Sequence, residues 1–182
     1  MHRLETVFTS QEVGEQVARV AGEISEAYRD ADEPVVLVCV LKGAFVFFAD
    51  LLRHLDFDTE IEFVRLASYG SGTAPSQEIS FSKDVETSLQ GKHVLVVEDI
   101  VDTGHTVDYL DRQFRARGTA SLKICSLIHK LERRDVGSDP DFTCFTVNSG
   151  FLVGCGLDYA ERYRGLPGIH EVHFPESSEG AS

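Results

Sequence analysis

The sequence has no long hydrophobic run, no closely paired cysteines and little positive charge. Its longest uninterrupted apolar stretch extends from Val35 to Leu41, far short of the ~20 residues that a membrane-spanning helix needs. Met1 to Ser10 lack the basic, apolar and small-residue sections of a secretory signal, so we expect a cytoplasmic protein. The four cysteines are widely spaced and form no CxxC pair, which favours reduced core thiols over a disulfide framework or a zinc site.

The shortage of basic residues restricts the partners that we expect. The 182 residues include 17 Lys and Arg against 30 Asp and Glu, for a formal net charge of −13. This balance argues against a protein whose affinity comes from neutralising the phosphates of nucleic acid or of an anionic membrane. We therefore expect neither nucleic acid nor a membrane as a partner.

Length and apolar content predict one globular domain. A chain of 182 residues with 42% hydrophobic residues is compatible with a single core. We place this domain at 1–174 and expect a flexible tail at 175–182. Thr9 and Glu12 form a capping-box pattern ahead of apolar residues at helical spacing. Apolar patterns predict strands at 35–41, 61–66, 94–97 and 122–128, and helices at 13–24, 44–55 and 106–117.

Strands that alternate with helices favour an α/β fold with a parallel sheet. The short stretches 142–147 and 151–154 predict extra strands at one side. Residues 69–77, made largely of Gly, Ser, Thr and Pro, predict a loop and a candidate mobile flap. His170 and His173 form a single HxxH, for which an alternating C-terminal strand is a better explanation than a metal pair.

The segment 94–106 is the most informative part of the chain. Glu98 and Asp99 come at the carboxyl end of a buried strand, Asp102 follows, and Thr103-Gly104-His105-Thr106 opens a predicted helix. Ligands of open α/β sheets bind at that edge. A turn at a helix N-terminus offers backbone N–H groups to a phosphate, while the adjacent acids suit sugar hydroxyls or a hydrated cation. Each residue alone is explained as well by a strand end or a helix cap, but their combination favours a binding site.

Residues 98–106 resemble the phosphoribosyl-diphosphate (PRPP) signature of the type I phosphoribosyltransferases, in the form of the hypoxanthine-guanine branch. The resemblance extends to Leu41-Lys42-Gly43, which is similar to the pyrophosphate loop of the family, and to Ser68-Tyr69, which is similar to the start of its flexible loop. Lys130, residues 151–154 and residues 157–159 resemble its purine pocket. Residues 74–77 depart from the Ser-Ser-Gly that is usual in many bacterial members.

The resemblance implies a mainly parallel twisted sheet flanked by helices, with the core at about 35–130. A small purine-binding hood would come from about 1–10 and 142–174. It also implies a purine salvage enzyme that transfers 5-phosphoribosyl from PRPP to N9 of a 6-oxopurine, with Mg²⁺, to give IMP or GMP and pyrophosphate. Homo-oligomers, either dimers or tetramers, are the expectation from the family alone.

The resemblance also assigns roles around PRPP. Leu41, Lys42 and Gly43 would hold pyrophosphate through a cis peptide between the first two, with help from Arg164. Thr103, Gly104, His105 and Thr106 would bind the phosphate, His105 through its backbone N–H. Glu98 and Asp99 would contact the ribose hydroxyls and support a hydrated metal, and Asp158 would ligate the Mg²⁺ bound to pyrophosphate.

On the purine side, Asp102 would be the general base or proton-holding partner at N7, and Lys130 the cation that polarises the 6-oxo group. Phe151 would stack on the base, and the backbone near Leu152 and Asp158 would face its 2-position. Ser68 and Tyr69 would lie on a flap that closes during turnover and excludes water.

Two alternatives stay open. A regulator that senses PRPP or nucleotides and binds RNA shares the fold and the signature, but it should display a basic surface. A xanthine-preferring transferase differs only in what faces the purine 2-position, and we favour hypoxanthine, with guanine also accepted. Adenine-specific members carry Ala where this chain has Asp102, so a 6-oxopurine is the better substrate class.

Overall fold

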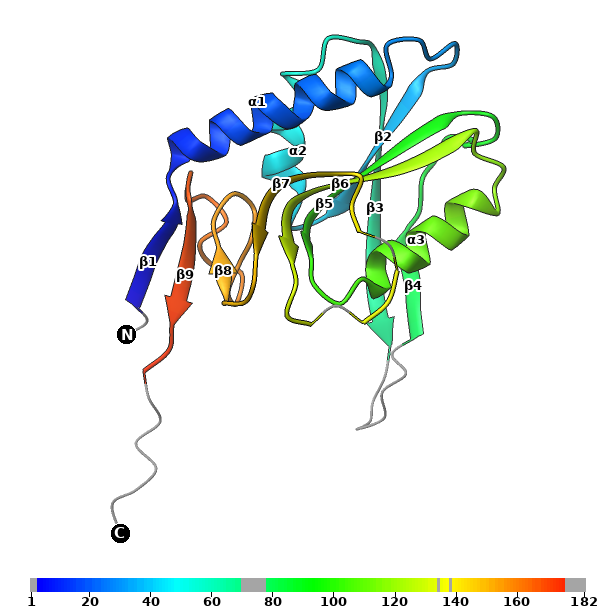
Figure 1. The fold of residues 1–182 in the computed structure, drawn as a ribbon. Helices are drawn as coiled ribbons and strands as arrows, with labels where there is room; N and C mark the ends of the chain where they lie inside the picture. The colour runs from blue at the N-terminus through cyan, green and yellow to red at the C-terminus, as the bar shows by residue number, and fades with distance from the viewer. Residues whose placement is uncertain (1–2, 70–77, 134, 138, 176–182) are drawn as a thin grey trace.

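The computed structural model describes residues 3–69, 78–133, 135–137 and 139–175, and it contains two sheets (Figure 1). The larger sheet has the strand order β4-β3-β2-β5-β6-β7. All neighbours in it are parallel except β3 and β4. Its strands are β2 (Val35–Leu41), β3 (Thr59–Tyr69), β4 (Glu78–Lys83), β5 (His93–Val101), β6 (Ser121–Lys130) and β7 (Phe142–Val147).

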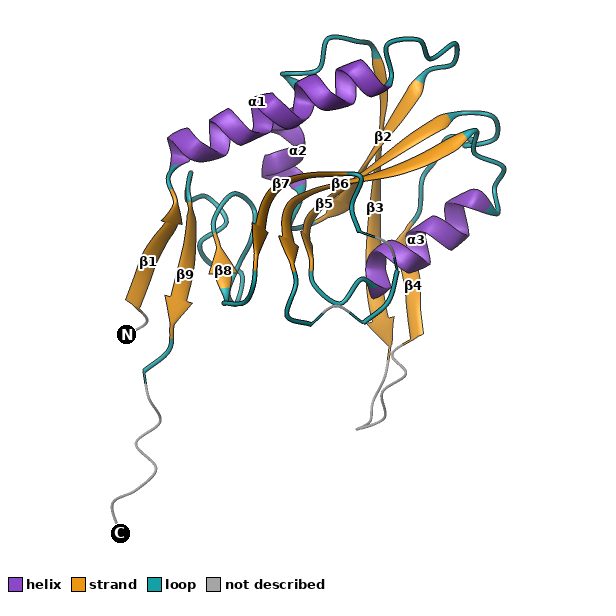
Figure 2. Ribbon diagram, viewed as in Figure 1, coloured by secondary structure: helices purple, strands orange, loops and turns teal. Residues whose placement is uncertain are grey.

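Helices cover both faces of this sheet, as the alternating pattern predicts. Helices α1 (Ser10–Ala27) and α2 (Phe45–Leu52) lie on one face and α3 (His105–Arg115) on the other (Figure 2). The strands β2 and β5 are buried on both faces, so each contributes alternate residues to two separate apolar clusters. No described helix is long and apolar enough to cross a membrane.

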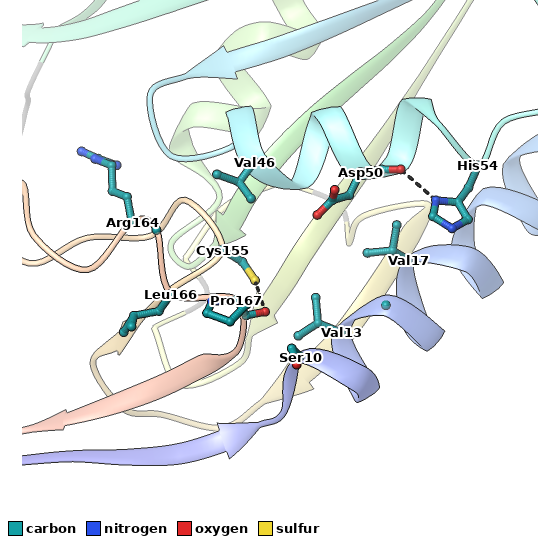
Figure 3. A pocket seen from close by; sticks show the side chains of 12 residues that line it. Ser10, Val13, Val17, Val46, Asp50, His54, Cys155, Arg164, Leu166 and Pro167 are labelled. Carbon is teal, nitrogen blue, oxygen red and sulfur yellow. Dashed lines mark hydrogen bonds between the residues drawn. The ribbon is translucent and has the colours of Figure 1, made fainter.

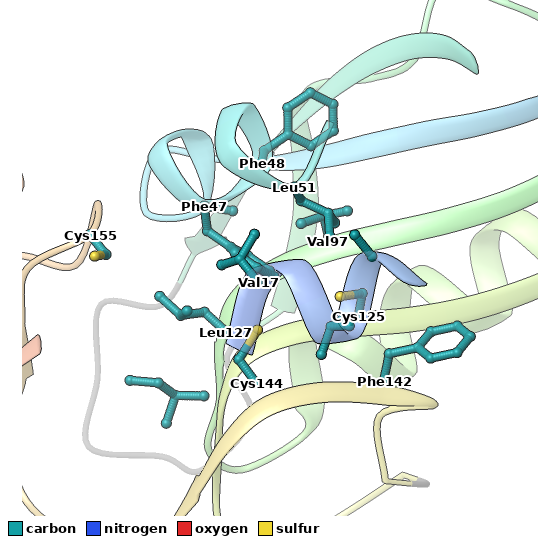
Figure 4. Close-up of a cluster of buried hydrophobic side chains, with 14 of the residues drawn as sticks. Val17, Phe47, Phe48, Leu51, Val97, Cys125, Leu127, Phe142, Cys144 and Cys155 are labelled. Atoms are coloured by element: carbon teal, nitrogen blue, oxygen red, sulfur yellow. The ribbon is translucent and has the colours of Figure 1, made fainter. Parts of the chain in front are cut away.

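The core on the α1–α2 face explains why the first helix packs where it does. Val17 of α1 and Phe47 of α2 are almost fully buried, and they meet Val97 of β5 and Leu127 of β6 (Figure 4). The capping box at the start of α1 is confirmed: the Thr9 side chain accepts from the Glu12 N–H, and the Glu12 carboxylate accepts from the Thr9 N–H.

The cysteines are core residues, as expected. All four thiols are free and buried in one apolar cluster, and Cys125, Cys144 and Cys155 are labelled in Figure 4. Burial raises the pKa of the Cys39 thiol to about 12. A thiol that stays protonated at neutral pH is a poor nucleophile and a poor metal ligand.

The second sheet is formed by segments from near the two ends of the chain. Strand β9 (Ile169–His173) pairs antiparallel with β1 (Arg3–Phe8) on one side and with β8 (Leu152–Val153) on the other. This second sheet stands beside the main sheet, next to β7 (Figure 1). This arrangement is the hood expected from the resemblance, and its last strand confirms the alternating strand predicted around His170 and His173.

The structure corrects several boundaries. Helix α2 ends at Leu52 rather than at 55, and α3 runs from His105 to Arg115 rather than from 106 to 117. Gly118 at φ 76° turns the chain out of α3, and its N–H bonds to the Arg115 carbonyl. Strand β4 was not predicted, although Ile79 and Phe81 alternate with serines. The predicted loop falls almost entirely on 70–77, outside the described residues.

Candidate active site

The predicted site residues meet at one edge of the main sheet because β2, β5 and β6 are parallel neighbours that end there. The turn after β2 packs directly against β5: a Cβ added to Gly43 would lie 1.5 Å from Asp99 Oδ2. On its other side, a Cβ on Gly156 would lie 2.0 Å from the Gly43 carbonyl oxygen. Only glycine permits both approaches. The peptide bond between Leu41 and Lys42 is cis, as the resemblance implies.

The turn between β5 and α3 forms a helix N-terminus that faces this edge. Gly104 has φ 90°, and its carbonyl accepts the Asp108 N–H of the first helical turn. Glycine has no side chain, so position 104 supplies no capping acceptor for the first N–H groups of α3. A phosphate bound at a helix N-terminus accepts hydrogen bonds from these N–H groups. His105 and Thr106 are the first two residues of that helix.

The two adjacent acids are held in an unfavourable environment. Glu98 is 7% exposed, its Oε2 has no hydrogen-bond partner among the described residues, and burial followed by the charge of Asp99 raises its pKa well above the ordinary value. Burial also raises the pKa of Asp99 to about 6, against the lowering effect of hydrogen bonds from backbone N–H groups and of the Arg164 charge. Paired, buried carboxylates of this kind mark sites that bind or react rather than sites that stabilise a fold.

Asp102 and Lys130 come together, although they are far apart in the sequence. Asp102 Oδ2 lies 3.9 Å from Lys130 Nζ and 3.7 Å from Arg133 Nη1. Asp102 Oδ1 is buried without a hydrogen-bond partner among the described residues. One carboxylate oxygen therefore faces two cations, while the other remains free to accept a proton or a hydrogen bond. Arg133 was missed by sequence reasoning, because nothing in its local pattern points toward Asp102.

Asp158 and Arg164 form a second charged group at the same edge. Arg164 Nη2 lies 2.8 Å from Asp158 Oδ1, and Arg164 Nη1 donates to the Gly156 carbonyl at 2.7 Å. Glu161 connects this group to the turn after β2, since its Oε1 lies 3.1 Å from Lys42 Nζ. Neither Gly156 nor Glu161 was predicted. The glycine could have been found from the Gly-x-Gly that follows Val153, but the glutamate has no distinctive signal.

The hood contributes three aromatic rings in mutual edge-to-face contact. Phe151 lies 5.5 Å from Tyr159 and 5.6 Å from Phe174, measured between ring centroids. Phe151 remains 43% exposed, and Leu152 next to it is buried in β8. Tyr159 belongs to the segment 157–159 that resembles the purine pocket, whereas Phe174 was not among the predicted site residues. Ser68 and Tyr69 end β3, and the structure does not describe their side chains.

A separate cavity of about 400 Å³ lies between α1, α2 and the segment 155–167. Asp50 of α2 and His54, which follows that helix, face Val13 and Val17 of α1 across it, with Cys155 on the third wall (Figure 3). It shares Arg164 with the site just described but none of the acids on β5. It is therefore not the predicted substrate site.

Comparisons with known proteins agree with this geometry. The family model described as "Phosphoribosyl transferase domain" matches residues 4–160. The hypoxanthine phosphoribosyltransferase of Escherichia coli is 38% identical over 171 residues, covering 94% of this chain and 96% of the relative. The hypoxanthine-guanine phosphoribosyltransferase of Bacillus subtilis is 41% identical over 169 residues, covering 92% and 93%.

A solved structure has a similar level of sequence identity to this chain. The crystal structure of a hypoxanthine-guanine phosphoribosyltransferase from Bacillus anthracis, with a HEPES molecule in its active site, has a TM-score of 0.85 and 39% identity. The match covers 93% of this chain and 98% of that chain. Sequence, fold and site geometry lead to one conclusion: the chain belongs to the phosphoribosyltransferase family and has the type I fold.

Proposed function

We propose that this chain is a 6-oxopurine phosphoribosyltransferase of purine salvage. It transfers 5-phosphoribosyl from PRPP to N9 of hypoxanthine, and also of guanine, and releases pyrophosphate with IMP or GMP. The observation that carries this function is the placement of Asp102 beside Lys130, directly before the turn that opens α3. Relatives at about 40% identity with these activities in their names support it.

The reaction is a problem of charge. As the bond between C1 and pyrophosphate breaks, positive charge develops on the ribose and negative charge on the leaving group, so the site must stabilise both. The turn at 103–106 binds the 5′-phosphate through backbone N–H groups and the field of α3. Asp99 and Glu98 hold the ribose hydroxyls, and the negative charge of Asp99, whose pKa is about 6, favours the electron-poor ring at neutral pH.

Pyrophosphate is held on the opposite side of the ribose. Leu41, Lys42 and Gly43 present their backbone to it, and Arg164 supplies a guanidinium that is suited to phosphate oxygens. The ion pair between Lys42 and Glu161 and that between Arg164 and Asp158 keep these cations in place before the substrate arrives.

The acids at this edge also fit Mg²⁺. This cation takes oxygen ligands and is usually bound by one or two carboxylates together with substrate phosphates. Asp99 and Asp158 lie close enough for the charge of Asp158 to raise the Asp99 pKa, and Glu98 holds a buried oxygen without a partner among the described residues. The described residues contain no cluster of three potential ligands, as suits a cation that binds with the diphosphate. When bound, Mg²⁺ neutralises charge on the leaving group.

Asp102 and Lys130 act on the base. The free Oδ1 of Asp102 holds the proton or hydrogen bond at purine N7, while the Lys130 ammonium donates to the 6-oxo oxygen. An adenine offers an amino group at that position, so a Lys donor disfavours it. Phe151 stacks on the base, and the backbone near Leu152 and Asp158 reads the 2-position. Ser68 and Tyr69 belong to the flap that excludes water during turnover.

The test is incubation with PRPP and Mg²⁺ against hypoxanthine, guanine, xanthine and adenine separately, with detection of each nucleoside monophosphate. We expect product from hypoxanthine and guanine and none from adenine. Product mainly from xanthine would show the alternative specificity, and product from no base would reject the function. We further propose that the chain is cytoplasmic and forms a homo-oligomer, either a dimer or a tetramer. Light scattering of the purified chain would test the oligomeric state.

A further inference from the structure

We propose that the segment made of residues 131–133 and 135–137, which follows β6, orients the phosphate-binding turn by holding the carbonyl of Thr103. This role rests on the function proposed above and adds Asp135 and Val136 to it as positioning residues. Both donate their backbone N–H to the Thr103 oxygen, at 3.1 and 3.2 Å. No other part of the function described so far uses these two residues.

The segment is anchored at its beginning, so it can act as a support. Its first two N–H groups, those of Leu131 and Glu132, donate to the carbonyls of Val147 and Asn148 at 3.0 Å each. On either side of residue 134, which the structure does not describe, residues 131–132 bond to the end of β7 and residues 135–136 bond to the turn between β5 and α3. A carbonyl that accepts two hydrogen bonds from an anchored segment cannot rotate without breaking both.

The orientation of the Thr103 carbonyl determines that of the Gly104 N–H, because the two belong to one planar peptide unit. That bond is trans, so the two groups point in opposite directions. The carbonyl points at the segment, and the Gly104 N–H therefore points away from it. Gly104 sits at φ 90°, and glycine rotates more freely than any other residue. An external restraint is what keeps this donor aimed at the ligand.

Two side-chain contacts place the segment further. Asp135 Oδ2 lies 3.2 Å from His105 Nε2, and Arg133 Nη1 lies 3.7 Å from Asp102 Oδ2. His105, Asp135 and Arg133 are more than half exposed, so each pair contributes little free energy. These two contacts instead fix the position of the segment along the turn, and so determine which of its N–H groups reach the Thr103 oxygen. The two backbone hydrogen bonds also polarise the peptide, which strengthens Gly104 as a donor.

Proline at position 136 tests this role because proline has no N–H. We expect Val136→Pro to weaken binding of ribose 5-phosphate by about five- to tenfold, the effect of losing roughly one hydrogen bond. Binding of inorganic pyrophosphate, which does not use this turn, should stay within about twofold of the parent. Val136→Ala keeps the N–H and is the matched control, with parent-like binding of both. Calorimetric titration measures the affinity of the parent and of each variant for both ligands, and an equal loss of affinity for both ligands in Val136→Pro would overturn the role.

A measurement on the unmodified chain keeps the role testable if the proline variant does not fold. Amide NMR should show protection of the Asp135 and Val136 N–H groups from hydrogen exchange, and a shift of the Gly104 amide on addition of ribose 5-phosphate. Unprotected amides at 135 and 136 would overturn the role. If the parent failed to make nucleoside monophosphate, the proposed function would be rejected. Binding of ribose 5-phosphate tests the positioning role without turnover, so it distinguishes failure of the role from failure of the function.

Discussion

At the scale of single residues, the site is built from groups that a stable fold would avoid. Glu98 and Asp99 are carboxylates in positions where burial raises the pKa of both. Asp102 Oδ1 is buried with no partner among the described residues. Such groups destabilise the folded chain until a ligand satisfies them. Part of the favourable free energy of ligand binding therefore comes from removing this destabilisation.

The raised pKa of Asp99 has a definite consequence for stability. Its value is about 6 in the folded chain, against an ordinary 3.8. Between these two values the folded state binds more protons than the unfolded state, so the free energy of unfolding falls as pH rises from about 4 to about 6. Asp99→Asn removes the charge, and we expect it to melt at a higher temperature than the parent at about pH 7.5.

The difference should shrink on acidification, because protonated Asp and Asn are both neutral. Thermal unfolding followed by circular dichroism at about pH 4.5 and pH 7.5 measures it. A surface variant, Asp111→Asn, serves as the control, since Asp111 forms an ion pair with Arg115 on the exposed side of α3. If Asp99→Asn lowered the melting temperature at the higher pH, the account of this carboxylate would be wrong.

Asp102→Asn tests the proton-holding role. The substitution keeps the shape of the side chain but removes its capacity to hold a proton at N7, so we expect kcat to fall by about 10²-fold or more. The KM for PRPP should change by no more than about threefold, because binding of the phosphates does not depend on this proton. Steady-state kinetics with hypoxanthine measure both values. Parent-like turnover would remove Asp102 from the chemistry.

At the scale of elements, the site depends on close approach between turns. Gly156 has φ 99°, and an added Cβ would lie 2.0 Å from the Gly43 carbonyl oxygen. We therefore expect Gly156→Ala to destabilise the chain by about 2 kcal/mol or more, and to displace the turn after β2. Denaturant unfolding and the KM for pyrophosphate in the reverse reaction measure the two effects.

Gly22→Ala is the matched control for that substitution. Gly22 lies within α1, and an added Cβ there has no heavy atom within 4 Å. Alanine is favoured over glycine inside a helix by about 0.5–1 kcal/mol. We expect this variant to be slightly more stable than the parent, with unchanged kinetics. A similar loss of stability in both variants would contradict the packing argument at Gly156.

Local pattern predicts some of these elements and not others. The apolar runs at 35–41 and 94–97 identify central strands, because residues buried on both faces leave a continuous hydrophobic signal. The edge strand β4 was missed, since its pairing with β3 depends on a neighbour rather than on its own short pattern. In the site, Asp102 was found from a motif. Arg133 and Asp135 were not, because their roles arise from a tertiary contact with the turn at 102–105.

At the scale of the whole molecule, the charge of −13 argues against an RNA-binding regulator of the same fold. Binding to RNA phosphates requires a basic surface and weakens steeply with salt. We expect no mobility shift of a structured RNA by this chain at about 0.1 M salt, with or without PRPP. A nucleotide-dependent shift that disappears at high salt would favour the regulator instead.

The hood joins positions that lie almost a whole chain length apart: Thr6 and His170 are paired across 164 residues. During synthesis on the ribosome, the turn between β5 and α3, which we propose binds phosphate, is complete long before β9 emerges to lie between β1 and β8. Contacts of such long range are slow to form. The nascent polypeptide should therefore form the main sheet with this turn first and complete the hood only after its last strand is released.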